Sequence, residues 1–189
     1  MAMPSPSTAT RATLADLALT PRKAELIGGR IVPLMATGHR PNQIAAFIYR
    51  NLYDHAEAVG RGVVYTDNMG FAVSELSSGR ESFSPDAAYY LGPLPSDGMD
   101  FVAGPPTLAV EVRSKGDHGD AAEAEMAAKR ADYFEAGTLV VWDVDTMADV
   151  VRSHRAEAPD RPSTFGAGQM ADAELAVPGW RVAVDRIFA

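Results

Sequence analysis

The sequence contains no cysteine. Disulfide bridges, thiolate metal sites and cysteine nucleophiles are therefore excluded, and the composition is compatible with a reducing cytoplasm. No apolar run approaches the roughly 20 residues that a membrane-spanning helix requires, and the N-terminus lacks the apolar core of a signal peptide. We therefore expect a cytoplasmic protein with no membrane partner.

Several short catalytic motifs are missing as well. There is no His-x-His or His-Glu-x-x-His spacing, which argues against a zinc hydrolase. There is also no Gly-x-Ser-x-Gly elbow, Walker loop or Gly-x-Gly-x-x-Gly fingerprint. These absences argue against most of the enzyme classes that can be identified from a short sequence motif.

Basic residues are scarce relative to acidic ones. The chain has 17 Lys and Arg against 25 Asp and Glu, which gives a formal net charge of −8 at pH 7. Proteins that coat nucleic acid through bulk electrostatics must neutralise many phosphates, so this balance argues against that class. An enzyme can still act on nucleic acid through a local basic patch, and acidic clusters that hold divalent cations also raise the acidic count.

The composition is otherwise that of a globular protein. With 189 residues, 47% of them hydrophobic, the chain can bury roughly 70% of its unfolded surface in one domain. Residues 1–12 are rich in small residues and proline and are expected to be a disordered leader, followed by a single domain over 13–189. Sequence patterns predict helices over residues 13–19, 41–59 and 120–136, a hairpin over 24–32, and strands over 63–66, 71–74, 83–91, 107–112, 138–142, 149–153 and 178–184.

This order of elements predicts an α/β fold with a mixed central β-sheet flanked by helices. The strand over residues 107–112 lacks polar alternation, which indicates a central strand covered on both faces. Segment 92–106 is rich in Pro, Gly and Asp and is expected to be a functional or mobile loop. The charged segment 155–162 is expected to be a loop too.

Two carboxylates and a lysine stand on neighbouring predicted elements. The apolar strand 107–112 leads to Glu111, Asp86 begins the preceding strand, and Lys129 lies on the helix that follows. Carboxylates that converge at strand ends offer the hard oxygen ligands that Mg²⁺ or Mn²⁺ prefers, with water and substrate phosphate completing the shell. The arrangement suggests a metal-dependent phosphodiesterase site.

Simpler interpretations stay open at this point. Asp86 follows a proline and suits a turn, and Glu111 suits an ion pair. On a helical wheel Lys129 and Arg130 flank the apolar stripe on opposite sides, so the pattern does not choose which of them faces the acids. A lysine there would offset phosphate charge, but most helix lysines lie along the surface.

The histidines give weaker signals. His39, just ahead of the long helix, is a candidate proton carrier or phosphate contact, or else a loop or capping residue. His118 and His154 lie in polar segments and are expected to face solvent.

An ordered series of short motifs resembles a known family, the Uma-two family of restriction-endonuclease-like proteins. The likeness runs from about Thr13 to Phe188. The segments that carry it are Leu14-Ala-Asp-Leu17, Glu25-Leu-Ile-Gly-Gly-Arg-Ile31, Ser84-Pro-Asp86, Leu108-Ala-Val-Glu-Val-Arg-Ser114, Lys129-Arg-Ala-Asp-Tyr-Phe-Glu-Ala-Gly137, Val141-Trp-Asp-Val-Asp145 and Val177-Pro-Gly-Trp180.

The resemblance implies a branch of the PD-(D/E)xK nuclease superfamily, with a mixed sheet, flanking helices and acids at a strand fork. Pro85-Asp86 matches the first acidic element and Glu111 the second acid. The metal ligands implied are therefore Asp86 and Glu111. Glu25 matches an acid of the family's first hairpin and is expected to extend the site.

The lysine expected two residues after the second acid is missing, because Arg113 stands there. In this family the lysine is supplied by the next helix, and Lys129 matches that place. Lys115 also departs from the pattern, since the family commonly has proline at this position.

The function that the resemblance implies is a Mg²⁺- or Mn²⁺-dependent endonuclease that cuts DNA. Asp86, Glu111, Lys129 and Glu25 are the expected site residues. The alternative is a catalytically inactive relative that binds nucleic acid or a protein partner through the same cleft. A homodimer is expected by resemblance, because many nucleases of this superfamily pair to cut both strands.

Overall fold

A computed structural model of the chain describes residues 11–189. The leader predicted over residues 1–12 lies outside this range except for its last two residues. Arg11 there forms ion pairs with Glu75 at 2.6 Å and Glu81 at 2.8 Å. Among residues 11–189, no helix combines the length and the apolarity needed to cross a membrane.

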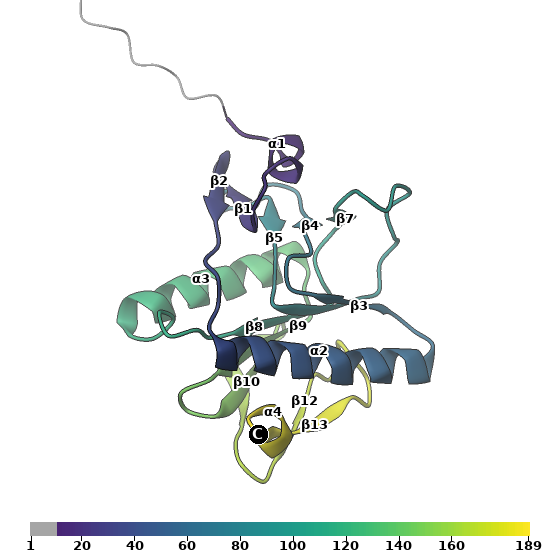
Figure 1. Cartoon of the computed structure of the whole chain (residues 1–189), viewed down its shortest axis with the longest axis vertical. Helices are drawn as coiled ribbons and strands as arrows, with labels where there is room; N and C mark the ends of the chain where they lie inside the picture. The colour runs from purple at the N-terminus through teal and green to yellow at the C-terminus, as the bar shows by residue number, and fades with distance from the viewer. Residues whose placement is uncertain (1–10) are drawn as a thin grey trace, which may run out of the picture.

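A mixed sheet of six strands forms the centre of the molecule, as predicted (Figure 1). The order across it is β11-β10-β9-β8-β6-β3, with β8 and β9 parallel and the other neighbours antiparallel. Its strands are β3 (Val63–Thr66), β6 (Ala87–Tyr90), β8 (Leu108–Val112), β9 (Val140–Asp145), β10 (Val150–Arg155) and β11 (Ala158–Phe165).

Within residues 11–189, four helices accompany the sheet. They are α1 (Leu14–Ala18), α2 (His39–Val59), α3 (Asp120–Ala136) and α4 (Val184–Ile187). The buried residues of α2 recur every four positions, so the helix packs on the sheet through one apolar stripe. The helix begins two residues before its predicted start. The helix α3 connects β8 to β9, which is the crossover that a parallel pair of strands requires.

Smaller sheets complete the fold. The strands β1 (Ala24–Ile27) and β2 (Arg30–Pro33) form the predicted hairpin, with positive φ at Gly28 and Gly29 as a two-residue turn demands. Figure 1 places this hairpin above the large sheet, near α3 and three short strands. Those three are β4 (Phe71–Ala72), β5 (Ser82–Phe83) and β7 (Val102–Ala103), and a last pair is β12 (Met170–Asp172) and β13 (Arg181–Ala183).

The two faces of the large sheet have separate cores. On one face, α2 and α4 cover the side chains of Val110, Val112 and Trp142, and Trp142 stacks on Trp180 at 4.7 Å between ring centroids. On the other face, Tyr133 of α3 stacks on Phe83 of β5 at 4.1 Å. The prediction of a central strand buried on both faces is confirmed for β8.

Some predicted boundaries are wrong. The strand expected over residues 83–91 is two strands, interrupted at Ser84-Pro85-Asp86. The segment expected to be a loop over 155–162 runs instead into β11, which among the described residues pairs with β10 alone, at the edge of the sheet. Pro159 and Pro162 argue against a strand in the sequence, because proline has no backbone N–H to donate to a neighbouring strand. An edge strand such as β11 tolerates proline, because one of its sides has no neighbouring strand.

Candidate functional site

The two predicted acids lie close together where β6 begins beside β8. Ala87 of β6 pairs with Val110 of β8 in antiparallel register, and Asp86 and Glu111 are the residues just beyond this pair. The backbone amide of Asp86 donates to the carbonyl oxygen of Val110 at 3.0 Å, so the regular register ends here. Besides burial, the negative charge of Asp86 acts to raise the pKa of Glu111, which reflects the closeness of the two carboxylates. The backbone amide of Val112 donates to Asp86 Oδ2 at 2.7 Å, which fixes this carboxylate at the entry to β6.

Helix α3 supplies two groups to Glu111. Lys129 Nζ lies 2.9 Å from Glu111 Oε1, and the hydroxyl of Tyr133 donates to the same oxygen at 2.6 Å. The two residues are four positions apart, so they lie on one face of the helix. Lys129, and not Arg130, is therefore the α3 cation that faces the acids.

Glu25 joins the hairpin to the same cluster. It is buried, and its Oε1 lies 3.2 Å from Lys129 Nζ and accepts a 3.0 Å hydrogen bond from the backbone amide of Ser84. Its Oε2 is paired with Arg80. Arg80 in turn lies 2.8 Å from Asp132 of α3. Both oxygens of Glu25 are thus committed to groups of the protein.

Lys23 is a member of the cluster that sequence reasoning missed. Its Nζ pairs with Asp67 and lies 3.5 Å from Asp86 Oδ1. The signal was available, because side chains two residues apart on an extended strand share a face. Lys23 stands two residues before Glu25, which the family resemblance had already singled out.

Burial and neighbouring positive charges have opposite effects on the pKa values of the three carboxyl groups, Asp86, Glu111 and Glu25. Burial raises the pKa of Asp86, although Lys23 acts to lower it, and burial likewise raises the pKa of Glu111 against the opposing charge of Lys129. Burial also acts against ionised Glu25, but Lys129 and Arg80 outweigh it and lower the pKa of that carboxyl.

Lys129 itself is held as a cation. Burial alone would lower the pKa of its ammonium group, but the neighbouring Glu111 and Glu25 outweigh burial and raise it. Proton release from Lys129 near neutral pH is therefore strongly disfavoured.

The donor atoms fit a small divalent cation. Within residues 11–189 no cluster of three or more acidic or histidine side chains is placed to hold a metal. Asp86 and Glu111 each commit one oxygen to a short hydrogen bond, at Oδ2 and Oε1. Their second oxygens are Asp86 Oδ1, which lies 3.5 Å from Lys23 Nζ, and Glu111 Oε2, and these are the candidate metal ligands. Mg²⁺ is commonly held by one or two carboxylates, with water and phosphate as further ligands, so this pair suffices.

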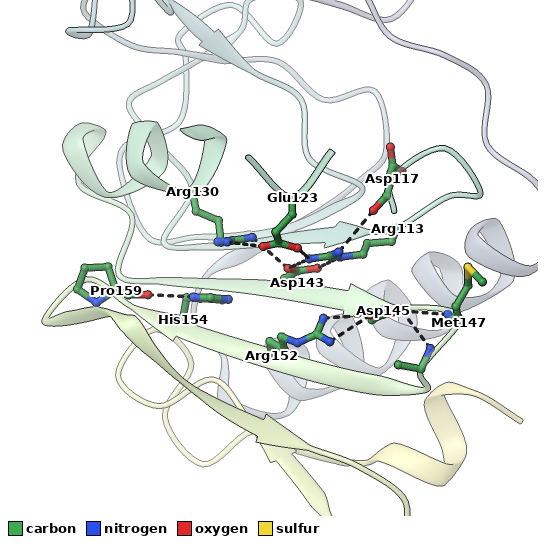
Figure 2. A network of polar contacts seen from close by, with 11 residues as sticks. Arg113, Asp117, Glu123, Arg130, Asp143, Asp145, Met147, Arg152, His154 and Pro159 are labelled. Carbon is green, nitrogen blue, oxygen red and sulfur yellow. Dashed lines mark hydrogen bonds and ion pairs between the residues drawn. The ribbon is translucent and has the colours of Figure 1, made fainter. Parts of the chain in front are cut away.

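Arg113, which replaces the usual lysine, belongs to a separate network (Figure 2). Its guanidinium makes two 2.6 Å hydrogen bonds to Asp143 and a third to Glu123. Arg130 joins both acids at 3.0 Å. This network ties α3 to β9 and leaves neither arginine facing Asp86.

The remaining candidates lie away from the acids. His39 is exposed at the start of α2, and Lys115 is exposed in the loop after β8 and forms no ion pair within the described residues. The expectation that His154 faces solvent is wrong, because its side chain is buried on a face of the sheet. Its Nδ1 lies 3.0 Å from the carbonyl oxygen of Pro159 (Figure 2), and burial lowers its pKa. His118 is half-buried rather than exposed.

Comparisons with known proteins identify the family of the chain and a solved structure with the same fold. No curated protein matches the chain. A solved crystal structure, described as that of a putative nuclease belonging to DUF820 from Anabaena variabilis, matches with a TM-score of 0.73 at 14% identity, over 93% of this chain and 97% of that one. That likeness shows a shared fold. The model of the Uma2 (Uma-two) family, described as "Putative restriction endonuclease", matches residues 12–185, and the chain therefore belongs to this family.

Proposed function

We propose that this protein is an endonuclease that uses Mg²⁺ or Mn²⁺ to hydrolyse DNA phosphodiester bonds. The observation that carries the proposal is the closeness of Asp86 and Glu111 where β6 begins beside β8, with the ammonium group of Lys129 2.9 Å from Glu111. Membership of a nuclease-like family supports DNA as the substrate. The acids would hold the metal, and the lysine would face the phosphate.

The bound cation and the side chains around it have different roles in this proposal. A bound cation would polarise a phosphoryl oxygen and lower the pKa of a water molecule. Lys129, held as a cation between Glu25 and Glu111, suits stabilisation of charge that develops on the phosphate and does not suit proton abstraction. Tyr133 fixes the Glu111 carboxylate, and Glu25 fixes Lys129.

Glu25 acts as a positioning residue in this account, not as an additional metal ligand. Its two oxygens already accept from Ser84, Lys129 and Arg80. Recruiting it to a metal would break contacts made in a buried environment, where an unpaired charge is costly.

A plasmid-nicking assay tests the proposal. We expect the wild-type protein to convert supercoiled DNA to nicked or linear forms with Mg²⁺ or Mn²⁺ and not with EDTA. The variants Asp86→Asn and Glu111→Gln should lose this activity. Asp160→Asn, which changes an exposed acid of β11, is the matched control and should keep it. Equal activity in Asp86→Asn and the wild type would refute the proposal, and binding without cleavage would favour the inactive relative.

The homodimer and the cytoplasmic location stay predictions from resemblance and composition. Sedimentation of the purified chain, with and without a DNA duplex, checks the first of them. A cleavage site on one protomer acts on one strand, so a dimer would be the form that cuts both.

A further inference from the structure

A second candidate site lies on the opposite side of the sheet. A surface hollow of about 540 Å³ opens between the first half of α2 and the end of α4 with the two residues that follow it. We call it the basic hollow, defined by His39, Arg40, Phe47, Arg50, Arg186 and Phe188. In Figure 1, α4 lies beside α2, away from the hairpin β1–β2 that carries Glu25.

Cationic side chains from two helices converge in the basic hollow. The guanidinium carbons of Arg50 and Arg186 each lie 5.9 Å from the centroid of the same ring, that of Phe47. Arg40 lies 5.9 Å from the ring of Phe188 and pairs with Asp149 at its outer end. Within the described residues, neither Arg50 nor Arg186 forms an ion pair.

The side chains of the basic hollow carry an excess of positive charge. Arg50 and Arg186 both approach the ring of Phe47, and no side chain that lines the basic hollow is acidic, although Ala189, the last residue of the sequence, also lines it. Cation–π contacts of exposed arginines stabilise by about 0.5–1 kcal/mol each. The chain as a whole carries a net charge of −8, so a local excess of positive charge is not a property of its entire surface.

The lining matches a particular ligand chemistry. Guanidinium forks bind phosphate oxygens in pairs, and their planes stack on aromatic groups. The first turn of α2, which begins at His39 and has no side-chain cap, adds unpaired amide donors at one end. The volume falls within the range of about 300–1,000 Å³ that is typical of small-molecule sites.

We propose that the basic hollow binds a nucleotide. Its phosphate would lie between Arg50 and Arg186, and its base would contact the side formed by Arg40 and Phe188. The nucleotide could be a free mononucleotide or the phosphorylated end of a strand, since both present the same chemistry.

The basic hollow is distinct from the candidate cleavage site. Its walls belong to α2 and α4, which cover the face of the sheet that carries Val110 and Val112. Glu111 points to the other side, where it contacts Lys129 and Tyr133 of α3, and Asp86 contacts Val112 and Lys23. A phosphate in the basic hollow is therefore not the phosphate that these acids would address, and the proposal does not depend on cleavage.

Calorimetry of the full chain in EDTA tests the proposal with four probes: dAMP, 2′-deoxyadenosine, inorganic phosphate, and a short single-stranded oligonucleotide with a 5′-phosphate. We expect dAMP or the oligonucleotide to bind more tightly than deoxyadenosine and inorganic phosphate. Arg50→Gln and Arg186→Gln should each weaken that binding about tenfold or more, since each removes charged hydrogen bonds. Arg161→Gln, in the exposed part of β11, is the matched control and should bind as the wild type does.

The outcomes separate the possibilities. Binding of dAMP points to a free nucleotide as the ligand, and binding of the oligonucleotide alone points to a strand end. Equal affinity for inorganic phosphate and dAMP would overturn the proposal, as would unchanged affinity in both arginine variants. Loss of binding in Asp86→Asn would also overturn it, because that residue lies in the other site. Melting temperatures without ligand verify that the arginine variants are folded.

Discussion

Lys129 Nζ lies 2.9 Å from Glu111 Oε1, and this contact joins α3 to the central strand β8. Glu25 lies on the other side of the same ammonium group at 3.2 Å. One cation thus holds two buried carboxylates that come from separate parts of the chain. The contact gives Lys129 both a structural role and the position from which it would act on a phosphate.

Replacement of Lys129 by methionine should therefore abolish cleavage and also reduce stability. The variant leaves Glu111 and Glu25 without their shared cation, and breaking a partly buried pair costs about 1–3 kcal/mol here, below the 3–5 kcal/mol of fully buried pairs. Urea denaturation at pH 7 and the nicking assay measure the two effects. Lys115→Met, in the exposed loop, should change neither stability nor metal binding. A fully active Lys129→Met protein would remove this lysine from the mechanism.

Lys23 should oppose metal binding. Its ammonium group lies 3.5 Å from Asp86 Oδ1, a candidate metal ligand. A cation bound to that oxygen would lie close to the ammonium group, and the two positive charges would repel each other. We expect Lys23→Met to bind Mn²⁺ several-fold more tightly than the wild type in a calorimetric titration, an effect of about 1 kcal/mol. Weaker Mn²⁺ binding in this variant would show that Lys23 supports the site in some other way.

Asp86 should lower stability at neutral pH when no metal is bound. Burial raises its pKa above the ordinary value of 3.8. A carboxyl with a higher pKa in the fold than in the unfolded chain holds its proton more tightly when folded, so stability falls as pH rises from the unfolded to the folded pKa. Asp86→Asn, which can still accept from Val112, should melt at a higher temperature than the wild type at pH 7 in EDTA.

That difference should shrink as the pH approaches 3.8 and Asp86 becomes protonated in both states. Thermal melts between pH 3 and pH 8 follow it. An Asp86→Asn protein that melts below the wild type at pH 7 would show that the pair with Lys23 outweighs the cost of burial.

Arg113 should be structural and not catalytic. Its fork binds both oxygens of Asp143, and a lysine offers a single point charge in place of that geometry. Arg113→Lys introduces the lysine that was first expected two residues after Glu111, yet we expect the variant to lose about 1–3 kcal/mol of stability and to gain no activity. Urea denaturation and the nicking assay check this, and increased cleavage in the variant would contradict it.

The sequence carried enough information to place the main elements and the two acids. Periodicity located α2 and α3 within two residues, and the apolar run before Glu111 identified a buried central strand. Pairing across strands required the fold, because Asp86 and Glu111 meet only through the register of β6 with β8.

Other features depended on tertiary contacts that no local pattern encodes. The helical wheel does not show which of Lys129 and Arg130 faces the predicted acids. In the fold, Lys129 contacts Glu111 and Arg130 contacts Asp143, because α3 packs against both β8 and β9. Tyr133 packs its ring in the core beneath α3, and its hydroxyl nevertheless reaches Glu111. A tyrosine serves both roles because its ring is apolar and only its tip is polar.

The central claim is that Asp86 and Glu111 together bind one divalent cation. The most direct measurement is a calorimetric titration of the full chain with Mn²⁺ at pH 7, compared with Asp86→Asn, Glu111→Gln and the control Asp160→Asn. The account predicts one site per chain in the wild type and in Asp160→Asn, and no saturable binding at millimolar Mn²⁺ in the other two. Absence of binding to the folded wild type, or equal binding in all four proteins, would contradict it.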